Sequence, residues 1–381
     1  MKRLSESKTG LVFLIAQFLI MAGSIVILSY IHIFPVKYMI YLSGLAVVLL
    51  FLTFFSQKSE TFKMAGRVFA AIFILLFAGI AFYGLKTYQA LQQVVVDDSD
   101  EMGMLGSEPE REPVEESFYV YISGVDVSGE IKKNSRSDVN MVITVNPKTK
   151  QIHLTATPRD YYVPLANSNG VEDKLTHAGE YGVQNSLKTL EMLYDVNIDY
   201  YIRVNFTSLS KIVDTLGGVT VYSDYTFTSD WGPSFVKGYN EVNGAEALAF
   251  CRERHHFAEG DRQRIKNHQY MFEAIFKKIM SPSILSKYLD LLKVLSENVQ
   301  TNMKVSEITD LAKMQMKDGA KWKITSYSVD GTGARRATYS YPSRKLYVMI
   351  PNKETVEEAK LRMKQIFTNN QSEYNSTEGK D

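Results

Sequence analysis

Residues 134–165 read NSRSDVNMVITVNPKTKQIHLTATPRDYYVPL and contain two short runs with the character of strands. These runs are VNMVITV (139–145) and QIHLTAT (151–157), each of a length typical of one strand. Charged clusters flank them, because RSD (136–138) precedes the first run and PRD (158–160) follows the second. Polar groups at strand ends are well placed to meet a ligand. This stretch therefore predicts a sheet whose strand ends carry a functional site.

Further strand-like and helix-like stretches surround this pair. The strand-like runs are FYVYIS (118–123), DYYIRV (199–204), GVTVYS (218–223), KWKITSYSV (321–329) and KLYVMI (345–350). The helix-like stretches lie near 185–194, 206–216, 243–252, 262–280, 285–299, 306–317 and 354–367. Strands interleaved with helices predict one α/β domain over residues 118–368. Ile265, Phe272, Ile275, Phe276 and Ile279 recur at helical spacing and predict a core face, while Gly217-Gly218 predicts a sharp helix end.

Three uncharged apolar stretches lie near the amino terminus, at 11–31, 39–55 and 68–85. Each is close to the roughly 20 residues that cross the hydrocarbon core of a bilayer. The first is longer than the apolar part of a typical signal peptide and no small-residue cleavage site follows it, so we expect it to be retained. The sequence predicts three transmembrane helices within residues 11–90.

Basic residues near these stretches predict their orientation. Cytoplasmic loops carry an excess of lysine and arginine. The link between the first two stretches has only Lys37, whereas the amino terminus and the second link hold Lys2, Arg3, Lys8, Lys58, Lys63 and Arg67. Residues 1–10 are therefore predicted to be cytoplasmic. Three crossings then place the later domain outside the cytoplasm, in a multi-pass protein of the cell membrane.

Composition limits the remaining possibilities. The 381 residues carry 43 basic and 42 acidic side chains, which gives a formal net charge of +1 and no global attraction to polyanions. Cys251 is the only cysteine, so an intramolecular disulfide and a cysteine-based zinc cluster are excluded, and a small buried side chain is favoured there. Residues 91–117 are acidic and rich in Pro and Gly, which predicts a solvated tether. Residues 369–381 predict a polar tail.

Arginines gather in CRERHHFAEGDRQR (251–264). Arginine offers a fixed fork of donors that matches phosphate oxygens, so several together suggest a phosphate-rich ligand. Asp261 is predicted to be the N-cap of the following helix, whose free N–H groups would face the same anion. The alternative is that Asp261 only caps the helix and Arg262 is only solvated.

Asp126 and Asp138 are candidates for a magnesium site, since Mg²⁺ takes one or two carboxylates when a phosphate supplies other oxygens. The alternative is that Asp138 pairs with Arg136 or a neighbouring arginine and that Asp126 caps a turn. His255 and His256 are adjacent and in a helix or strand could not both face one metal, so an exposed pair is expected. No P-loop, GxSxG or HExxH motif is present.

The ordered set RSD, PRD, LGGV (216–219), GAEALAFCRER (244–254) and GDRQR (260–264) resembles the LytR-CpsA-Psr family of cell-envelope proteins. The resemblance implies a central mixed sheet flanked by helices. It also implies a membrane phosphotransferase that moves a capsule- or teichoic-acid-type glycopolymer from polyprenyl pyrophosphate to peptidoglycan in a Gram-positive bacterium, with Mg²⁺ or Mn²⁺ as cofactor. Peptidoglycan, the polyprenyl-linked polymer, the membrane and capsule assembly proteins are the implied partners; nucleic acid is not.

The resemblance also assigns residues. Asp126 and Asp138 match metal-binding aspartates. The pyrophosphate-binding positions match Arg136, Arg159, Lys174 of the KxxxA segment, Arg252, Arg254, Asp261, Arg264 and Gln269. Asp138, Arg159, Arg254 and Arg264 are the expected catalytic residues, and the apolar face of VNMVITV is expected to line a tunnel for the prenyl chain.

Two features depart from the family pattern. The double glutamine usual in the GDxxR helix is Asn267-His268-Gln269 here, and only the acidic tether stands where three-span members often have an accessory domain. Two other functions remain open: a polyprenyl-lipid sensor or scaffold for capsule assembly, and a polyprenyl-pyrophosphate phosphatase. The first would need the arginines but not the aspartates of the metal site.

Overall fold

The computed structural model describes residues 2–31, 36–59, 61–95, 113–125, 134–281 and 287–368. Asp126, most of the predicted tether and the predicted tail lie outside the described residues. The chain forms two compact units. One comprises Met1–Gln92 and Lys304–Gly319, and the other comprises Gln93–Met303 and Ala320–Asp381.

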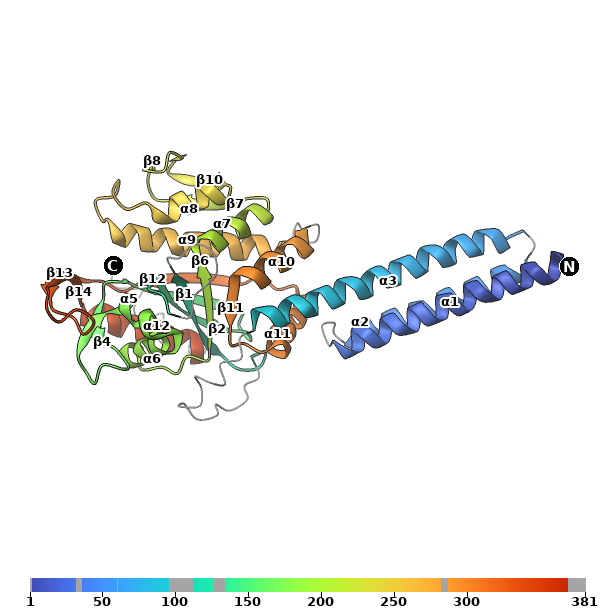
Figure 1. Cartoon of the computed structure of the whole chain (residues 1–381), viewed down its shortest axis with the longest axis horizontal. Helices are drawn as coiled ribbons and strands as arrows, with labels where there is room; N and C mark the ends of the chain where they lie inside the picture. The colour runs from blue at the N-terminus through green and yellow to red at the C-terminus, as the bar shows by residue number, and fades with distance from the viewer. Residues whose placement is uncertain are drawn as a thin grey trace. The chain divides into compact units, whose positions relative to one another are not determined.

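Three long helices make up most of the first unit: α1 (Lys2–Tyr30), α2 (Val36–Lys58) and α3 (Lys63–Val94), with α11 (Val305–Asp318) grouped alongside them (Figure 1). Each of the three contains a segment long and apolar enough to cross a membrane. This confirms the three predicted apolar helices, while their orientation stays a prediction. α3 continues past the predicted end at residue 85, because the polar residues that follow are good helix formers.

The second unit is built on a six-stranded mixed sheet with the order β11-β6-β1-β2-β3-β12. β2 runs antiparallel to β1 and β3, whereas β6 is parallel to β1 and β12 is parallel to β3. The strands are β1 (Phe118–Val125), β2 (Ser137–Asn146), β3 (Gln151–Thr157), β6 (Tyr200–Asn205), β11 (Val299–Thr301) and β12 (Lys323–Ser328). The predicted mixed-sheet α/β domain is confirmed.

Helices cover both faces of this sheet (Figure 1). On one face, Tyr121 and Val142 pack with Tyr194 of α6 and Met363 of α12. Side chains alternate along a strand, so the opposite face carries Met141 and its neighbours, and α9 contacts β3 and β12. The helices are α5 (Leu175–Ala178), α6 (Val183–Tyr194), α7 (Phe206–Thr215), α8 (Gly244–Arg252), α9 (Asp261–Ile279), α10 (Tyr288–Asn298) and α12 (Lys353–Thr368).

Short two-stranded ribbons complete the unit. β7 (Val219–Ser223) pairs with β10 (Gly238–Val242), and β13 (Gly331–Arg336) pairs with β14 (Leu346–Pro351). The others are β4 (Tyr162–Pro164) with β5 (Glu172–Lys174) and β8 (Phe227–Thr228) with β9 (Ser234–Phe235). The predicted strands near 218–223 and 345–350 exist, but they belong to these ribbons and not to the central sheet. Most of the unpredicted strands are too short or too polar to produce a period-two apolar pattern.

Two local predictions about helices can be compared with the structure. Gly217 and Gly218 have φ angles of +75° and +86°, a conformation that stops α7 as expected. Along α9, Ile265 is buried, but the other predicted core residues are only partly buried. The buried face near its amino terminus is polar instead, with Gln263, Arg264, Asn267, His268 and Gln269. These buried polar residues place the amino-terminal part of α9 at the candidate site.

Candidate active site

The strand ends converge on one edge of the sheet. β1 and β3 run in one direction and β2 in the other, so Val125 pairs with Ser137 and Thr157 pairs with Asn140 at the same edge. Asp138 is the second residue of β2, and Arg159 lies two residues after the end of β3, so both are at this edge. The predicted convergence of RSD and PRD is observed.

Arg159 forms the centre of this edge. Its Nη1 lies 2.8 Å from Asp138 Oδ2, and both side chains are mostly buried. The Arg159 Nε atom lies 3.9 Å from Asp160 Oδ2. Burial alone would lower the pKa of Arg159, but the charges of Asp138, Asp160 and Asp261 outweigh it and raise that pKa. Asp138 thus pairs with a neighbouring arginine, as the alternative interpretation of the sequence allowed.

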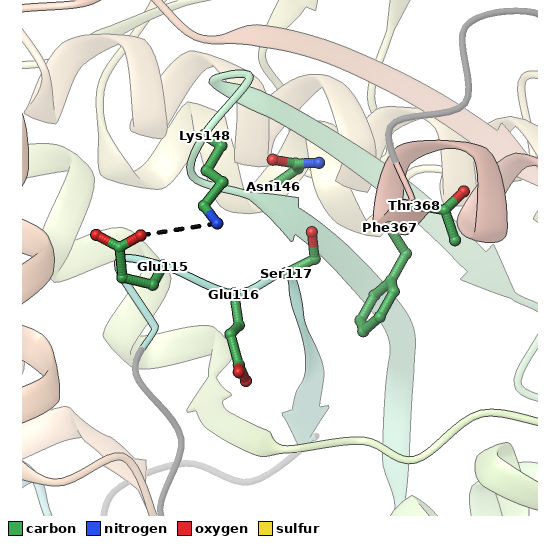
Figure 2. A pocket seen from close by; sticks show the side chains of 7 residues that line it. All are labelled: Glu115, Glu116, Ser117, Asn146, Lys148, Phe367 and Thr368. Atoms are coloured by element: carbon green, nitrogen blue, oxygen red, sulfur yellow. Dashed lines mark ion pairs between the residues drawn. The ribbon is translucent and has the colours of Figure 1, made fainter.

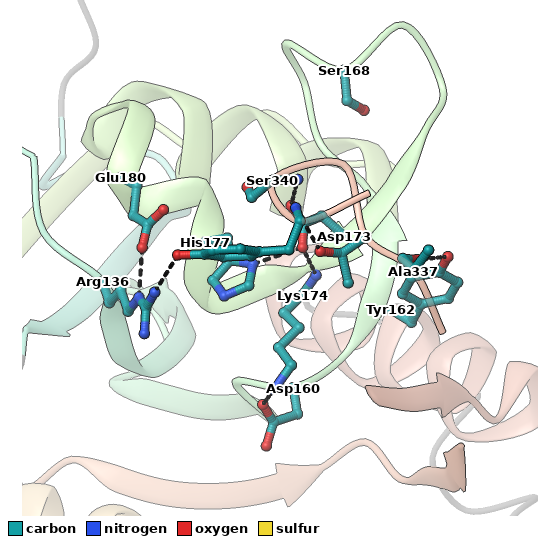
Figure 3. Close-up of polar contacts among 12 residues, drawn as sticks. Arg136, Asp160, Tyr162, Ser168, Asp173, Lys174, His177, Glu180, Ala337 and Ser340 are labelled. Carbon is teal, nitrogen blue, oxygen red and sulfur yellow. Dashed lines mark hydrogen bonds and ion pairs between the residues drawn. The ribbon is translucent and has the colours of Figure 1, made fainter. Parts of the chain in front are cut away.

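Lys174 joins the same group through Asp160. The Lys174 Nζ atom lies 2.8 Å from Asp160 Oδ1, and both side chains are mostly buried (Figure 3). Asp160 thereby links Lys174 to Arg159. Asp160 belongs to the PRD motif, but its role was not predictable from sequence, because a carboxylate between two cations has no local sequence signature.

Arg264 of α9 approaches from the other side. Its side chain is 9% exposed, and Nη2 lies 2.6 Å from Asp261 Oδ1. Burial is the main cause that lowers the pKa of Arg264, and the charges of Arg159 and Arg254 lower it further. These charge interactions show that separate segments bring several cations together.

The predicted N-cap role of Asp261 is wrong. Asp261 is the first residue of α9, and the N-cap is Gly260, which has a φ angle of +56°. Glycine adopts this left-handed backbone without the steric cost that a side chain would bring. The Asp261 carboxylate is consequently free of the helix end and pairs with Arg264.

Two buried donors in this group lack an acceptor. Within the residues that the structure describes, Arg159 Nε and Arg264 Nε are shielded from solvent and make no hydrogen bond. An unsatisfied buried donor costs about 1–3 kcal/mol, and more when the group is charged. An oxyanion with several acceptor oxygens would satisfy both guanidinium groups. We call Asp138, Arg159, Lys174, Asp261 and Arg264 the cationic cradle, since they surround these donors.

Arg136 lies beside a different set of partners. Its Nε is paired with Glu180, and its Nη2 donates to Tyr341 Oη at 2.9 Å (Figure 3). The side chain is half exposed. Glu180 and Tyr341 are far from Arg136 in sequence, so no motif predicted these partners. The role of Arg136 toward pyrophosphate stays a prediction.

Three further predicted residues have distinct contacts. The guanidinium of Arg252 lies over the ring of Phe206, 5.0 Å from its centroid. Arg254 is exposed, and its Nε donates to His255 Nε2 at 3.2 Å. Gln269 is buried, and its Nε2 donates to Tyr327 O at 2.8 Å. The contacts of Gln269 tie α9 to β12, whereas a pyrophosphate role for these residues stays a prediction.

The structure adds a contact at the start of α9 that the sequence did not indicate. Arg262 Nε lies 2.6 Å from Asp330 Oδ1, and Nη2 donates to Gly331 O at 3.0 Å. Asp330 lies two residues after β12, which runs parallel to β3, and is therefore at the same edge of the sheet as Arg159. The contact joins the start of α9 to the segment after β12 at the surface, where both side chains are about half exposed.

One predicted metal ligand can be assessed. The Asp138 carboxylate is 12% exposed and supplies hard oxygen atoms of the type that Mg²⁺ prefers. A magnesium site needs one or two carboxylates, and Asp138 could be one of them. Asp126 lies outside the described residues, so the magnesium site stays a prediction.

A separate pocket lies at the opposite edge of the sheet (Figure 2). Its volume is about 340 Å³, and it is lined by Glu115, Glu116, Ser117, Asn146, Lys148, Phe367 and Thr368. Lys148 Nζ lies 3.7 Å from Glu115 Oε2. The lining comes from the residues before β1, from the end of β2 and the turn after it, and from the end of α12, so the pocket is distant from the cradle along the strands. It does not share the cradle's paired, buried arginines.

Gly179 supports the segment that leads into Asp138. A Cβ atom built there would lie 2.3 Å from Ser135 O and 3.2 Å from Ser137 N. We expect Gly179→Ala to push this backbone outward and to lower the rate of the reaction at the cradle by about 10- to 100-fold, since displacements near 1 Å have effects of that size. Kinetics and thermal unfolding of the variant would check this. Wild-type rates would show that the segment adapts without moving Asp138.

Glu253 makes stability depend on acid pH. Burial raises the pKa of this carboxyl, but hydrogen bonds from the backbone N–H groups of Asp230, His255 and Arg254 and from His256 lower it to about 2. A carboxyl whose folded pKa is depressed stabilises the fold above its unfolded pKa, and this contribution is lost as pH falls toward the folded value. We expect the melting temperature to fall between about pH 4.5 and 2, and to fall less in Glu253→Gln. Thermal unfolding of both proteins at several pH values measures this. An equal fall of the melting temperature with pH in wild type and in Glu253→Gln would contradict the prediction.

The fold and the cradle define an α/β protein with apolar helices and a cluster of buried cationic side chains at one edge of its sheet. The model of the LytR_cpsA_psr family matches residues 85–365 of this chain. The chain belongs to this family.

Relatives agree with this assignment. Polyisoprenyl-teichoic acid--peptidoglycan teichoic acid transferase TagU of Bacillus licheniformis is 36% identical over 219 residues, 57% of this chain and 70% of its own. TagU of Bacillus subtilis is 32% identical over 284 residues, 73% of this chain and 89% of its own. The crystal structure of B. subtilis TagU matches with a TM-score of 0.52 and 31% identity, covering 66% of this chain and 97% of that chain. A structure of TagT bound to LI-WTA matches with a TM-score of 0.54 and 26% identity, covering 69% of this chain and 96% of that chain.

Proposed function

We propose that the protein transfers a teichoic-acid-type glycopolymer from a polyprenyl-pyrophosphate carrier to peptidoglycan. The observation that carries this proposal is the pair of buried arginine Nε donors, of Arg159 and Arg264, for which the described residues provide no acceptor. A pyrophosphate offers acceptor oxygens and negative charge to both. The names of the TagU relatives support the choice of teichoic acid and peptidoglycan as substrates.

The reaction would exchange one phosphorus–oxygen bond for another. A hydroxyl of peptidoglycan attacks the sugar-proximal phosphorus, the phosphoanhydride bond breaks, and polyprenyl phosphate leaves with the electron pair. The hydroxyl proton passes to a carboxylate, for which Asp138 and Asp160 are the candidates at the cradle. Such reactions depend mainly on positioning and on neutralising charge. Arg159, Arg254 and Arg264 would stabilise the charge that develops on the phosphate oxygens.

The carboxylates of the cradle have a role before substrate arrives. Asp138 and Asp261 now neutralise Arg159 and Arg264, at 2.8 and 2.6 Å. A pyrophosphate would take over these arginines, and Asp138, together with Asp126, would then be available to hold a Mg²⁺ or Mn²⁺ ion. The ion, when bound, would supply further positive charge at the phosphates.

The prenyl chain needs an apolar surface next to the cradle. Met141, Ile143 and Leu154 are buried on the sheet face that α9 covers, close to the strand ends where the cradle lies. We propose that this face receives the prenyl chain. The domain would act outside the cytoplasm, where peptidoglycan lies, which agrees with the orientation that the basic residues predict.

Hydrolysis is a related side reaction. Water can replace the peptidoglycan hydroxyl as the attacking group at the same phosphorus, since the cradle would bind the pyrophosphate in the same way. We propose a slow polyprenyl-pyrophosphate phosphatase activity that competing peptidoglycan suppresses.

Reconstitution tests the transfer directly. The full chain in detergent would be mixed with polyprenyl-pyrophosphate-linked teichoic acid, purified peptidoglycan and Mg²⁺. We expect polymer to become covalently attached to the peptidoglycan, and polyprenyl phosphate to be released in equal amount. Release of the lipid without attachment would indicate a phosphatase, and no turnover would contradict an enzymatic role.

A further inference from the structure

A second group of polar side chains lies outside the cradle, in the turn between α8 and α9. His255 Nδ1 lies 2.7 Å from Asp230 Oδ2, and His256 Nδ1 lies 3.2 Å from Glu253 Oε1 and 3.7 Å from Asp230 Oδ1. One donor atom from each of Asp230, Glu253 and His255 lies within 4.8 Å of the others. Asp230, Glu253 and His255 thus form a three-residue cluster at the surface, and His256 contacts both of its carboxylates.

The sequence-based argument against a shared metal does not apply here. Adjacent residues point apart in a helix or strand, but His255 and His256 lie in a turn after α8 has ended at Arg252. Both side chains are exposed as predicted, yet both Nδ1 atoms approach the same carboxylates. Asp230 reaches them from the ribbon of β8 and β9, so two separate segments contribute.

We propose that Asp230, Glu253, His255 and His256 form a binding site for a divalent transition metal of the zinc class. A tetrahedral zinc ion with bonds of about 2.0–2.2 Å holds neighbouring donor atoms about 3.3–3.6 Å apart. His256 Nδ1 lies 3.2 Å from Glu253 Oε1 and 3.7 Å from Asp230 Oδ1, close to that spacing, whereas His255 Nδ1 and Asp230 Oδ2, at 2.7 Å, would separate to admit the ion. Imidazole ligands favour zinc over magnesium. Two carboxylates also balance the charge of the ion.

One ligand is already held rigidly. The Glu253 side chain is fully buried, and its carboxylate accepts hydrogen bonds from the backbone N–H groups of Asp230, Arg254 and His255. Such partners orient a ligand before the ion binds, a feature common around metal sites. The other three side chains are 43–62% exposed and leave the cluster open to solvent.

Metal binding would alter the contacts of Arg254, one of the arginines proposed to stabilise charge on the phosphate oxygens. His255 Nε2 accepts from Arg254 Nε at 3.2 Å, so the imidazole proton belongs on Nδ1, which faces Asp230. An ion bound at Nδ1 moves that proton to Nε2, and Nε2 can then no longer accept. Metal binding therefore releases Arg254 from His255. This step does not require the transfer reaction.

Zinc titration tests the site. The full chain, purified in detergent without a polyhistidine tag, would be titrated with Zn²⁺ against a chromophoric chelator, with Mg²⁺ in excess. We expect the wild type to bind about one zinc ion per chain. In His255→Ala/His256→Ala the affinity for zinc should be at least about 100-fold lower, since even outer partners of a ligand contribute 10- to 100-fold. X-ray absorption of the zinc-loaded chain should show imidazole ligands.

Glu241→Gln is the matched control, because Glu241 is an exposed carboxylate on the nearby strand β10. It should bind zinc as the wild type does. Circular dichroism would establish that the double variant folds. Equal zinc binding by wild type and double variant, or none by either, would overturn the proposal and leave the cluster as a set of histidine–carboxylate ion pairs. Neither result depends on whether the chain transfers a glycopolymer.

Discussion

Arg264→Ala should reduce the rate of glycopolymer transfer by about 100- to 1,000-fold, the usual effect of removing one electrostatic contact to a reacting group. The Arg264 side chain is 9% exposed, and its Nε has no hydrogen-bond partner among the described residues. A small side chain would leave the phosphate without that donor and charge. It would also leave Asp261 unpaired beside the anion, which adds repulsion. Initial rates in the reconstituted assay measure this effect.

Arg262→Ala is the matched control for Arg264→Ala. Arg262 lies two residues earlier on α9, but it is half exposed and pairs with Asp330. Ion pairs at the surface contribute only about 0–1 kcal/mol, so we expect a rate within a few-fold of wild type. Equal losses in both variants would show that α9 had shifted as a whole. Full activity in both Arg264→Ala and Arg262→Ala would contradict the proposal that the cationic cradle binds the reacting phosphate.

Asp138→Asn should also reduce transfer by about 100-fold or more, through a different cause. Asparagine keeps the shape of the side chain, but it removes the negative charge that faces Arg159 at 2.8 Å and the carboxylate proposed to hold Mg²⁺. We expect the remaining activity to require a higher Mg²⁺ concentration than in wild type. Binding of the polyprenyl substrate should weaken much less, because Arg159 and Arg264 remain.

Asp195→Asn provides the comparison for Asp138→Asn. Asp195 is an exposed residue at the end of α6, with a φ angle of +56° that asparagine also adopts readily. Its activity and Mg²⁺ dependence should match those of wild type. A normal Mg²⁺ dependence in Asp138→Asn would argue against Asp138 as a metal ligand and in favour of its role as partner of Arg159.

The fold follows from the sequence where periodic patterns are long. The three apolar helices and five strands of the central sheet were predicted, because length and alternation determine them, whereas the short strand β11 was not. β7 and β14 were predicted as strands but not distinguished from the main sheet, and β8, β9 and β13 were not predicted. Sheet membership depends on contacts between distant segments, and GTGARR (331–336) has no apolar alternation that could reveal a strand.

The site was only partly predictable for a similar reason. Motifs identified the cationic residues, and the strand order brings Asp138 and Arg159 together as expected. The partners of those cations were not identified, because Glu180 and Tyr341 reach Arg136 from distant parts of the chain. The capping role given to Asp261 failed because Gly260 adopts the backbone conformation that begins the helix. Local patterns do not record such tertiary choices.

Mass spectrometry of lipid that purifies with the full chain tests the central claim most directly. Wild type, Arg262→Ala and Arg264→Ala would be expressed in a bacterial host, purified in detergent and extracted. The buried arginine pair predicts polyprenyl phosphate or pyrophosphate in wild type and Arg262→Ala, and little or none in Arg264→Ala. Absence of such lipid from wild type, or equal amounts in Arg264→Ala, would contradict the cradle as its binding site.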